Sequence, residues 1–283
     1  MAFLRLSLAI PLAAALSGPI FELDLFINDP SSGYQPTGWP QYLQTNATKY
    51  MNVAGISFIQ PSDLMNPSYD LPTEVATAVK SLRAQGVTVQ LLVGGEISSG
   101  WPQLESNPTT AANTAIALMK KYDCGIEIDN ESGGDTSAFI KAVAAGKPSG
   151  TYISMDVNGT PTGFQVSTYK GAADDIDWVN LMVSNPAYDQ ENSMTFANND
   201  GIPYSKQTVA YYAGTWVNNC NTVGSASDYG DTANGVALVK KHSARGLSVW
   251  AVGGASYGGC STTDAPGFSQ AMKDLGASNL NKL

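Results

Sequence analysis

The chain has 283 residues, of which 43% are hydrophobic and 14% charged, with 28 glycines and a formal net charge of -9. This composition is typical of a folded α/β protein with many tight turns, and it excludes a disordered chain. The acidic balance argues against nucleic acid and anionic membranes as partners, because both bind basic surfaces. No charge run, low-complexity tract or Ser/Pro-rich linker divides the chain, so we expect one domain in a monomeric protein.

The first residues predict a cleavable secretory leader. Arg5 precedes the apolar run 6–16, and small residues follow that run. The run is too short to span a bilayer. We therefore expect residues 1–17 to be a signal peptide, residues 18–283 to be the mature domain, and the protein to be secreted into the extracellular space without a membrane anchor.

Short apolar segments alternate with helical patterns along the rest of the chain. Expected strands cover residues 21–27, 53–59, 87–93, 123–131, 151–157, 176–183, 208–212 and 247–252, and expected helices cover 72–85, 109–122, 136–145 and 232–243. Such alternation favours parallel strands with right-handed crossovers, and eight strands at this length predict a single α/β domain, a closed (β/α)8 TIM barrel. A doubly wound open sheet is the alternative, but no G-x-G-x-x-G follows the first strand.

One strand carries a row of carboxyl groups. The segment 123–131 reads DCGIEIDNE and places Glu127, Asp129 and Glu131 two residues apart, so a β-strand puts all three on one face. The residues between them are apolar and β-branched, which predicts helices over the opposite face, although a solvated edge strand would show the same alternation. Like charges this close raise one another's pKa, so the row suits general acid catalysis.

This row resembles the fourth-strand signature of glycoside hydrolase family 18, the chitinases and endo-β-N-acetylglucosaminidases, which reads D-G-x-D-x-D-x-E. The segment 124–131 reads CGIEIDNE, so the final Asp-x-Glu is intact, while Cys124 and Glu127 replace the first two aspartates. Further resemblances to the third, sixth and eighth strands of the family lie at residues 91–97, 178–186 and 248–250. Their order and spacing are similar to short, single-domain, hevamine-like members and cover most of the mature chain.

The resemblance implies a retaining glycoside hydrolase that cleaves β-linked N-acetylglucosamine-containing glycans, of the chitin type or the N-glycan core, by substrate-assisted catalysis. Glu131 would protonate the leaving oxygen while the acetamido oxygen of the substrate attacks the anomeric carbon. Asp129 would hold the acetamido group, and Glu127 would share a proton with Asp129. The implied partner is an oligo- or polysaccharide, and neither a cofactor nor a metal ion is expected.

Five residues are expected to bind the sugar: Trp250, Trp216, Asn185, Tyr188 and Asn28. Trp250 and Trp216 lie near the C-terminal ends of the last two strands, and Trp250 matches the tryptophan that floors the sugar subsite in the family. The sixth-strand tyrosine of the family is absent. Asn185 stands in the matching region, Tyr188 lies in the loop that follows, and Asn28 ends the first strand.

Three cysteines leave one without a partner. Cys220 and Cys260 lie in Gly/Ser/Asn-rich stretches after neighbouring strands and are expected to form a disulfide, whereas Cys124, at a strand entry, is expected to be a buried thiol. The single histidine, His242, follows two lysines in a helical segment and is expected to face solvent. Acceptor motifs for N-glycosylation begin at Asn46, Asn130 and Asn158. Asn130 is expected to be inaccessible because it lies within the carboxylate row.

Two other functions stay open. The first is a non-catalytic lectin or inhibitor on the same barrel, although such proteins usually lose the terminal glutamate of the motif, which here is Glu131. The second is a glycosidase of related fold whose substrate lacks N-acetyl groups, with Asp156 or Asn28 as the first candidates for a separate nucleophile or base. A G-x-S-x-G match at residues 254–258 resembles an esterase nucleophile elbow, but the only histidine precedes it, so a serine triad is not expected.

Overall fold

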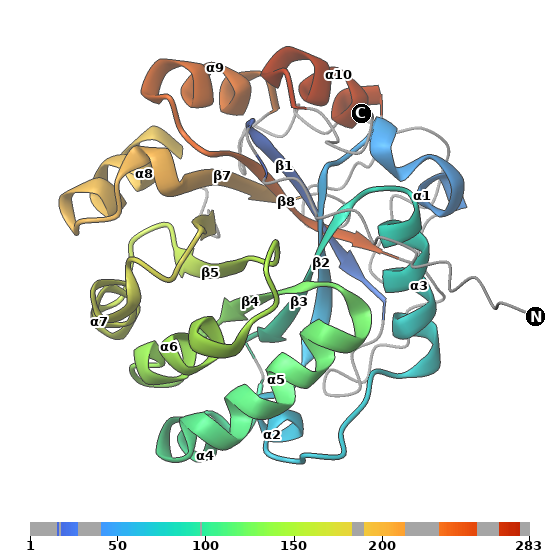
Figure 1. Cartoon of the computed structure of the whole chain (residues 1–283). Helices are drawn as coiled ribbons and strands as arrows, with labels where there is room; N and C mark the ends of the chain where they lie inside the picture. The colour runs from blue at the N-terminus through green and yellow to red at the C-terminus, as the bar shows by residue number, and fades with distance from the viewer. Residues whose placement is uncertain are drawn as a thin grey trace, which may run out of the picture.

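The chain forms a closed barrel of eight parallel strands. The computed structural model describes residue 16 and residues 18–27, 41–96, 98–182, 190–212, 232–253 and 266–277. The strands pair in chain order, and the last strand returns to pair with the first. Helices form a ring around the sheet (Figure 1). The expected (β/α)8 barrel is therefore confirmed.

All eight expected strands are present, and they differ from the expected segments mainly at their ends. Their bounds are β1 (Ile20–Phe26), β2 (Val53–Ile59), β3 (Thr88–Gly94), β4 (Gly125–Asp129), β5 (Ile153–Asn158), β6 (Trp178–Met182), β7 (Gln207–Tyr212) and β8 (Gly246–Gly253). The expected helices correspond to α3 (Thr73–Ala84), α5 (Pro108–Tyr122), α6 (Ser137–Gly146) and α9 (Thr232–His242). The structure adds α1 (Gln41–Asn46), α2 (Pro61–Leu64), α4 (Trp101–Ser106), α7 (Gly163–Ala172), α8 (Gln190–Asn199) and α10 (Pro266–Leu275), and the short 3₁₀ turns η1 (Ala47–Lys49) and η2 (Tyr204–Lys206).

Helix α3 shows how local sequence sets the length of an element. Pro72 stands just before the first helical residue, where its fixed backbone angle and missing N–H do no harm. Gly86 follows the helix with a φ of 86°, a left-handed conformation that glycine adopts without steric cost. The buried face consists of Val75, Ala78, Val79 and Leu82, at helical spacing. This apolar stripe lays the helix against the barrel.

The strands divide their side chains between two environments. In β4, Ile126 and Ile128 are 2% and 0% exposed and belong to the apolar core between strands and helices. Glu127 and Asp129 alternate with them and therefore face the barrel interior. Each fully buried isoleucine contributes about 1.5–3 kcal/mol. The outer core thus fixes the direction in which the carboxyl groups point.

The surroundings of Cys124 and His242 are described, and only those of Cys124 match the expectation. Cys124 is a buried free thiol, as expected, and burial raises its pKa to about 12. The expectation that His242 faces solvent is wrong, because its side chain is only 16% exposed. Its ring stacks on that of Tyr204 with 4.4 Å between centroids, and Nε2 lies 3.2 Å from Oε1 of Glu191.

Other expectations concern residues that the structure does not describe. The expected leader covers residues 1–17, of which only residue 16 is described, and the expected disulfide between Cys220 and Cys260 lies outside the described residues. Both stay predictions. Within the described part of the chain, none of the helices has both the length and the apolar character needed to cross a bilayer.

Candidate active site

The carboxylate row lies where the sequence places it. Glu127 and Asp129 are 0% and 4% exposed on β4, and Glu131 follows just past the end of the strand, where it is half-buried. The three groups therefore run from the barrel interior toward its C-terminal rim. Barrel enzymes keep their active sites at this rim. Of the three side chains, Glu131 has the most surface available to a ligand.

Strand β1 brings two more carboxyl groups to the row. Glu22 and Asp24 are 0% and 4% exposed, and one oxygen atom of each lies within 4.8 Å of an oxygen atom of Glu127. Gly55 on β2 leaves the space for this approach. A Cβ atom there would lie 2.1 Å from Oδ1 of Asp24 and 3.3 Å from Oε2 of Glu127. A side chain at position 55 would therefore displace the carboxyl group of Asp24 from its place beside Glu127.

Asn180 on β6 joins the two sets of carboxyl groups. Its Nδ2 donates hydrogen bonds to Oε2 of Glu22 at 3.1 Å and to Oε1 of Glu127 at 2.5 Å. The hydroxyl of Thr208 donates to Oδ1 of Asn180, which orients the amide so that its nitrogen faces the carboxyl groups. Nε1 of Trp178 gives Glu22 a second donor at 3.1 Å. These donors hold the acidic side chains in fixed positions.

Strand β5 supplies a further acidic residue. Asp156 is 5% exposed and hydrogen-bonds to Glu127 and Asn180. Burial raises the pKa of Asp156 to about 6. Its charge is also the second cause, after burial, of the raised pKa of Glu127 and of Asp129. Asp156 is therefore in electrostatic contact with the whole row.

The cluster has no buried counter-charge in the described part of the chain, where no Lys, Arg or His is among the buried residues. Burial raises the pKa of Glu22 to about 7. It also raises the pKa values of Asp24, Glu127 and Asp129 well above their usual range. Protons therefore neutralise much of the charge of this cluster at neutral pH.

Glu131 combines a raised pKa with access to a ligand. Burial is the main cause that brings its pKa to about 7, and the negative charges of Asp156 and Glu96 contribute. A carboxyl group with such a pKa is present in both protonation states near neutral pH. It can therefore donate a proton and take one back within a catalytic cycle.

A buried asparagine fixes the loop that carries Glu131. Asn130 is 3% exposed, its Oδ1 accepts a hydrogen bond from the backbone N–H of Gly133 at 2.7 Å, and its Nδ2 donates to the carbonyl of Gly134 at 2.9 Å. Glu105 on α4 accepts a hydrogen bond from the backbone N–H of Gly134. The glycosylation motif at Asn130 is thus inaccessible, as expected, because the amide is buried and used within the fold.

Three of these carboxylates are near enough to one another to be considered as cation ligands. Glu22, Asp24 and Glu127 form an oxygen-only set, which suits Ca²⁺ or Mg²⁺ by ligand type. Glu22 and Glu127 hydrogen-bond to each other, however, and two carboxyl groups do so through a shared proton. That proton already neutralises part of the charge that a cation would balance, so the spacing alone identifies no ion.

The expected sugar-binding residues are only partly described. Trp250 on β8 is partly exposed, and its ring centroid lies 5.3 Å from that of Phe58 at an interplanar angle of 41°. Trp250 thus belongs to an aromatic pair from β2 and β8. The other four expected residues lie outside the described part of the chain and stay predictions; they are Trp216, Asn185, Tyr188 and Asn28.

Three members of the cluster are not predicted from the sequence, and a fourth is predicted only for an alternative substrate. Glu22 and Asp24 are two of them, although the segment 21–25 reads FELDL and shows the same two-residue spacing as the row on β4. Asn180 gave no recognisable signal, because a single amide in a strand is common. Asp156 was a candidate only for the case of a substrate without N-acetyl groups.

Several solved structures have a fold similar to that of this chain. No protein-family model matches the chain, and neither does any curated protein. A chitinase from Rhizomucor miehei has a similar structure, with a TM-score of 0.66 and 14% sequence identity over 90% of this chain and 99% of that chain. A family 18 chitinase from Flavobacterium johnsoniae has a TM-score of 0.68 and 11% identity over 91% of this chain and 94% of that chain. A family 18 N-acetylglucosaminidase from Paenibacillus barengoltzii has a TM-score of 0.63 and 10% identity over 91% of this chain and 99% of that chain. At such low identities the likeness establishes a shared fold: a (β/α)8 barrel like those of glycoside hydrolase family 18.

The cluster predicts an unusual dependence of stability on pH. The pKa of Glu22 in the folded protein is about 7, above its ordinary value of 4.5, so the folded state binds more protons than the unfolded state between these values. The contribution of Glu22 to the free energy of unfolding is therefore fully present below pH 4.5 and is lost as the pH rises through the folded pKa of about 7. We expect the melting temperature to be higher at about pH 5 than at about pH 8.

The variant Glu22→Gln keeps the shape of the side chain but cannot ionise. It should melt at a higher temperature than the wild type at about pH 8 and should show a smaller fall between about pH 5 and about pH 8. The matched control is Glu74→Gln, at an exposed position of α3, which should leave the pH dependence unchanged. Equal pH dependence in wild type and Glu22→Gln would contradict this account of the cluster.

Proposed function

We propose that this protein is a retaining glycoside hydrolase that cleaves glycans containing β-linked N-acetylglucosamine. The observation that carries the proposal is Glu131, a half-buried carboxyl group with a pKa near 7 at the C-terminal rim of the barrel, at the end of the carboxylate row. The fold it shares with two chitinases and an N-acetylglucosaminidase supports the same class of reaction. A general acid at this position is what cleavage of a glycosidic bond requires.

In the proposed mechanism, Glu131 donates its proton to the glycosidic oxygen as the bond between that oxygen and the anomeric carbon breaks. The acetamido oxygen of the substrate attacks the anomeric carbon and forms a cyclic oxazolinium ion. Glu131, now a carboxylate, removes a proton from a water molecule that opens the ring from the face where the leaving group departed. Two displacements at one carbon give net retention of configuration.

Asp129 is proposed to hold the acetamido group. It is the last residue of β4 and lies two residues before Glu131 in the sequence. Its Oδ1 is buried without a hydrogen-bond partner within the described structure. That oxygen is available to accept the acetamido N–H. A negative charge on Asp129 would stabilise the oxazolinium ion as it forms, which lowers the barrier more than it strengthens ground-state binding.

Glu127 is proposed to act through a network of protons. Its hydrogen-bond partners include Asn180, Glu22 and Asp156, in addition to the expected exchange with Asp129. Because these partners come from three other strands, a proton held by the network can redistribute as the charge of Asp129 changes. Glu127 would thereby tune Asp129 without contacting the substrate.

The cellular setting is proposed from the leader pattern in the first 17 residues. The protein would be exported, would act as a monomer on an extracellular oligo- or polysaccharide, and would carry an N-linked glycan at Asn46, which lies on an exposed part of α1. The proposed disulfide between Cys220 and Cys260 would form in the same oxidising compartment.

A second candidate function is a glycosidase whose substrate lacks N-acetyl groups. One specific observation favours it: Asp156, from the neighbouring strand, is a second carboxyl group whose charge reaches Glu131. In a conventional retaining mechanism, such a group is the nucleophile and forms a covalent glycosyl-enzyme. The substrate preference of the protein separates the two candidates. A lectin on the same barrel would bind glycans without cleaving them.

The variant Glu131→Gln tests the proton donor. It keeps the shape of the side chain and removes the acid, so kcat should fall by at least about 10²-fold while KM changes little. In the wild type, activity should fall as the pH rises past about 7, because Glu131 must be protonated to donate. Activity on chitin oligomers and high-mannose N-glycans is the measurement, with Glu74→Gln as the control. Near-normal turnover in Glu131→Gln would show that Glu131 is not the proton donor.

The variant Asp129→Asn tests substrate assistance. It should lower kcat strongly and ground-state binding much less, because its contact strengthens only as positive charge develops on the substrate. A thiazoline analogue of the oxazolinium ion should bind at least about 10²-fold more tightly than substrate to the wild type. Efficient cleavage of a glycan without N-acetyl groups, together with indifference to the thiazoline, would favour the second candidate.

A further inference from the structure

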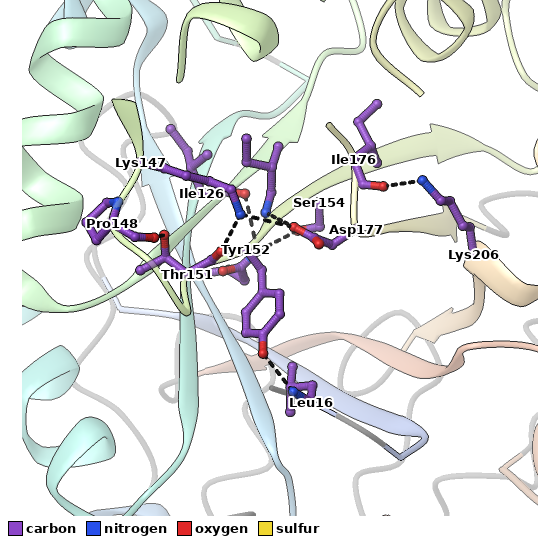
Figure 2. Close-up of polar contacts among 12 residues, drawn as sticks. Leu16, Ile126, Lys147, Pro148, Thr151, Tyr152, Ser154, Ile176, Asp177 and Lys206 are labelled. Carbon is purple, nitrogen blue, oxygen red and sulfur yellow. Dashed lines mark hydrogen bonds and ion pairs between the residues drawn. The ribbon is translucent and has the colours of Figure 1, made fainter. Parts of the chain in front are cut away.

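The opposite end of the barrel holds a residue from the predicted leader. The backbone N–H of Leu16 donates a hydrogen bond to the hydroxyl of Tyr152 at 2.7 Å, and Figure 2 shows the tyrosine ring directed at this atom. The guanidinium of Arg245 donates to the carbonyl of Leu16 at 2.9 Å and to the carbonyl of Gly18 at 3.0 Å. The backbone of Leu16 is therefore held at both its donor and its acceptor.

The side chain of Leu16 also has a place in the fold. With Tyr152 it packs against a small buried cluster made of Ile20, Val53 and Trp178. The rings of Tyr152 and Trp178 are 5.7 Å apart between centroids. This cluster covers the N-terminal end of the barrel interior, below the carboxyl groups that Trp178 helps to hold. Leu16 is thus structurally part of the barrel, although the sequence places it in the leader.

Two bonds in this segment fit the rule for leader cleavage, which asks for small residues one and three positions before the cut. Cleavage after Ala15 has Ala13 and Ala15 at those positions, and cleavage after Ser17 has Ala15 and Ser17. The sequence does not decide between them. The contacts of Leu16 favour the first cut, because only that cut keeps this residue in the mature chain.

We infer that the leader is removed by hydrolysis of the bond between Ala15 and Leu16, so that the mature protein begins at Leu16. The inference rests on the proposed export of the chain. Water adds across the bond, Ala15 leaves with the carboxylate, and Leu16 keeps the new amino group. That group retains N–H donors, so its hydrogen bond to the hydroxyl of Tyr152 survives the cut. The leader then ends at Ala15, two residues before the end expected from the sequence, which was Ser17.

The folded contacts do not direct the peptidase, which acts on the chain before it folds. They show instead which product keeps the contacts seen in the folded chain. A mature chain that began at Gly18 would leave the Tyr152 hydroxyl and one Arg245 nitrogen without the partners they have here, and would uncover part of the apolar cluster around Trp178. A chain that begins at Leu16 keeps all of these interactions.

The direct test is to express the full chain in a eukaryotic secretory host and to determine the N-terminus of the exported protein by sequencing and intact mass. Leu16 as the first residue supports the inference, whereas Gly18 or any other first residue overturns it. A chain that stays uncleaved inside the cell overturns both this inference and the proposed export. Catalytic failure with a Leu16 terminus would count only against the proposed reaction.

Two leader variants sharpen this test. Ala13→Leu places a large residue three positions before the inferred cut, so it should reduce processing at Leu16. Ser17→Leu changes a small residue that only the alternative cut needs, so the exported protein should still begin at Leu16. The reverse pattern, with Ser17→Leu blocking processing and Ala13→Leu tolerated, would contradict the inference.

A stability measurement tests the structural reason independently. Purified chains that begin at Leu16 and at Gly18 are compared, each with Tyr152 and with Tyr152→Phe, which keeps the ring and removes the hydroxyl. In the Leu16 chain, Tyr152→Phe should lower the melting temperature by about 2–4 °C, and in the Gly18 chain it should have almost no effect. The same loss in both chains would show that the hydroxyl does not act through Leu16.

Discussion

The structure depends on holding acidic groups together in a closed barrel without buried basic residues in its described part. Glu22, Asp24, Glu127, Asp129 and Asp156 come from three strands whose positions are fixed by the backbone ladder, so the side chains cannot move far apart. Ionising them all would cost several kcal/mol per group. Hydrogen bonds from Asn180 and Trp178, and protons shared between carboxyl groups, relieve this cost. Raised pKa values are the consequence.

Solvent exposure increases along the carboxylate row from Glu127 to Glu131. Glu127 is enclosed and hydrogen-bonded on several sides, whereas Glu131 lies at the rim and is half-buried. A proton donor needs both a raised pKa and contact with its substrate, and only the outer end of the row offers both. Asn130 and Glu105 hold the loop beyond the strand, so the position of Glu131 is set by the fold.

The sequence predicts the barrel, its eight strands and the row on β4, because apolar alternation and two-residue spacing are local patterns. It does not predict that Glu22 and Asp24 meet that row, because the lateral neighbours of a strand follow from barrel closure and from the space left by Gly55. The helix α7 was missed because its sequence, GFQVSTYKGA, carries two glycines and a weak apolar stripe. The prediction that His242 faces solvent was wrong because its contacts with η2 and α8, and not the neighbouring lysines, determine the exposure of its side chain.

The most direct test of the central claim is to titrate the carboxyl carbons by ¹³C NMR in protein labelled at glutamate, with Glu131→Gln to assign the signal of Glu131. We expect this signal to titrate with a pKa of about 7. The signal should be absent from the spectrum of Glu131→Gln. A Glu131 signal that titrates at the ordinary glutamate value of 4.5 would contradict the claim that the buried cluster makes this residue a proton donor at neutral pH.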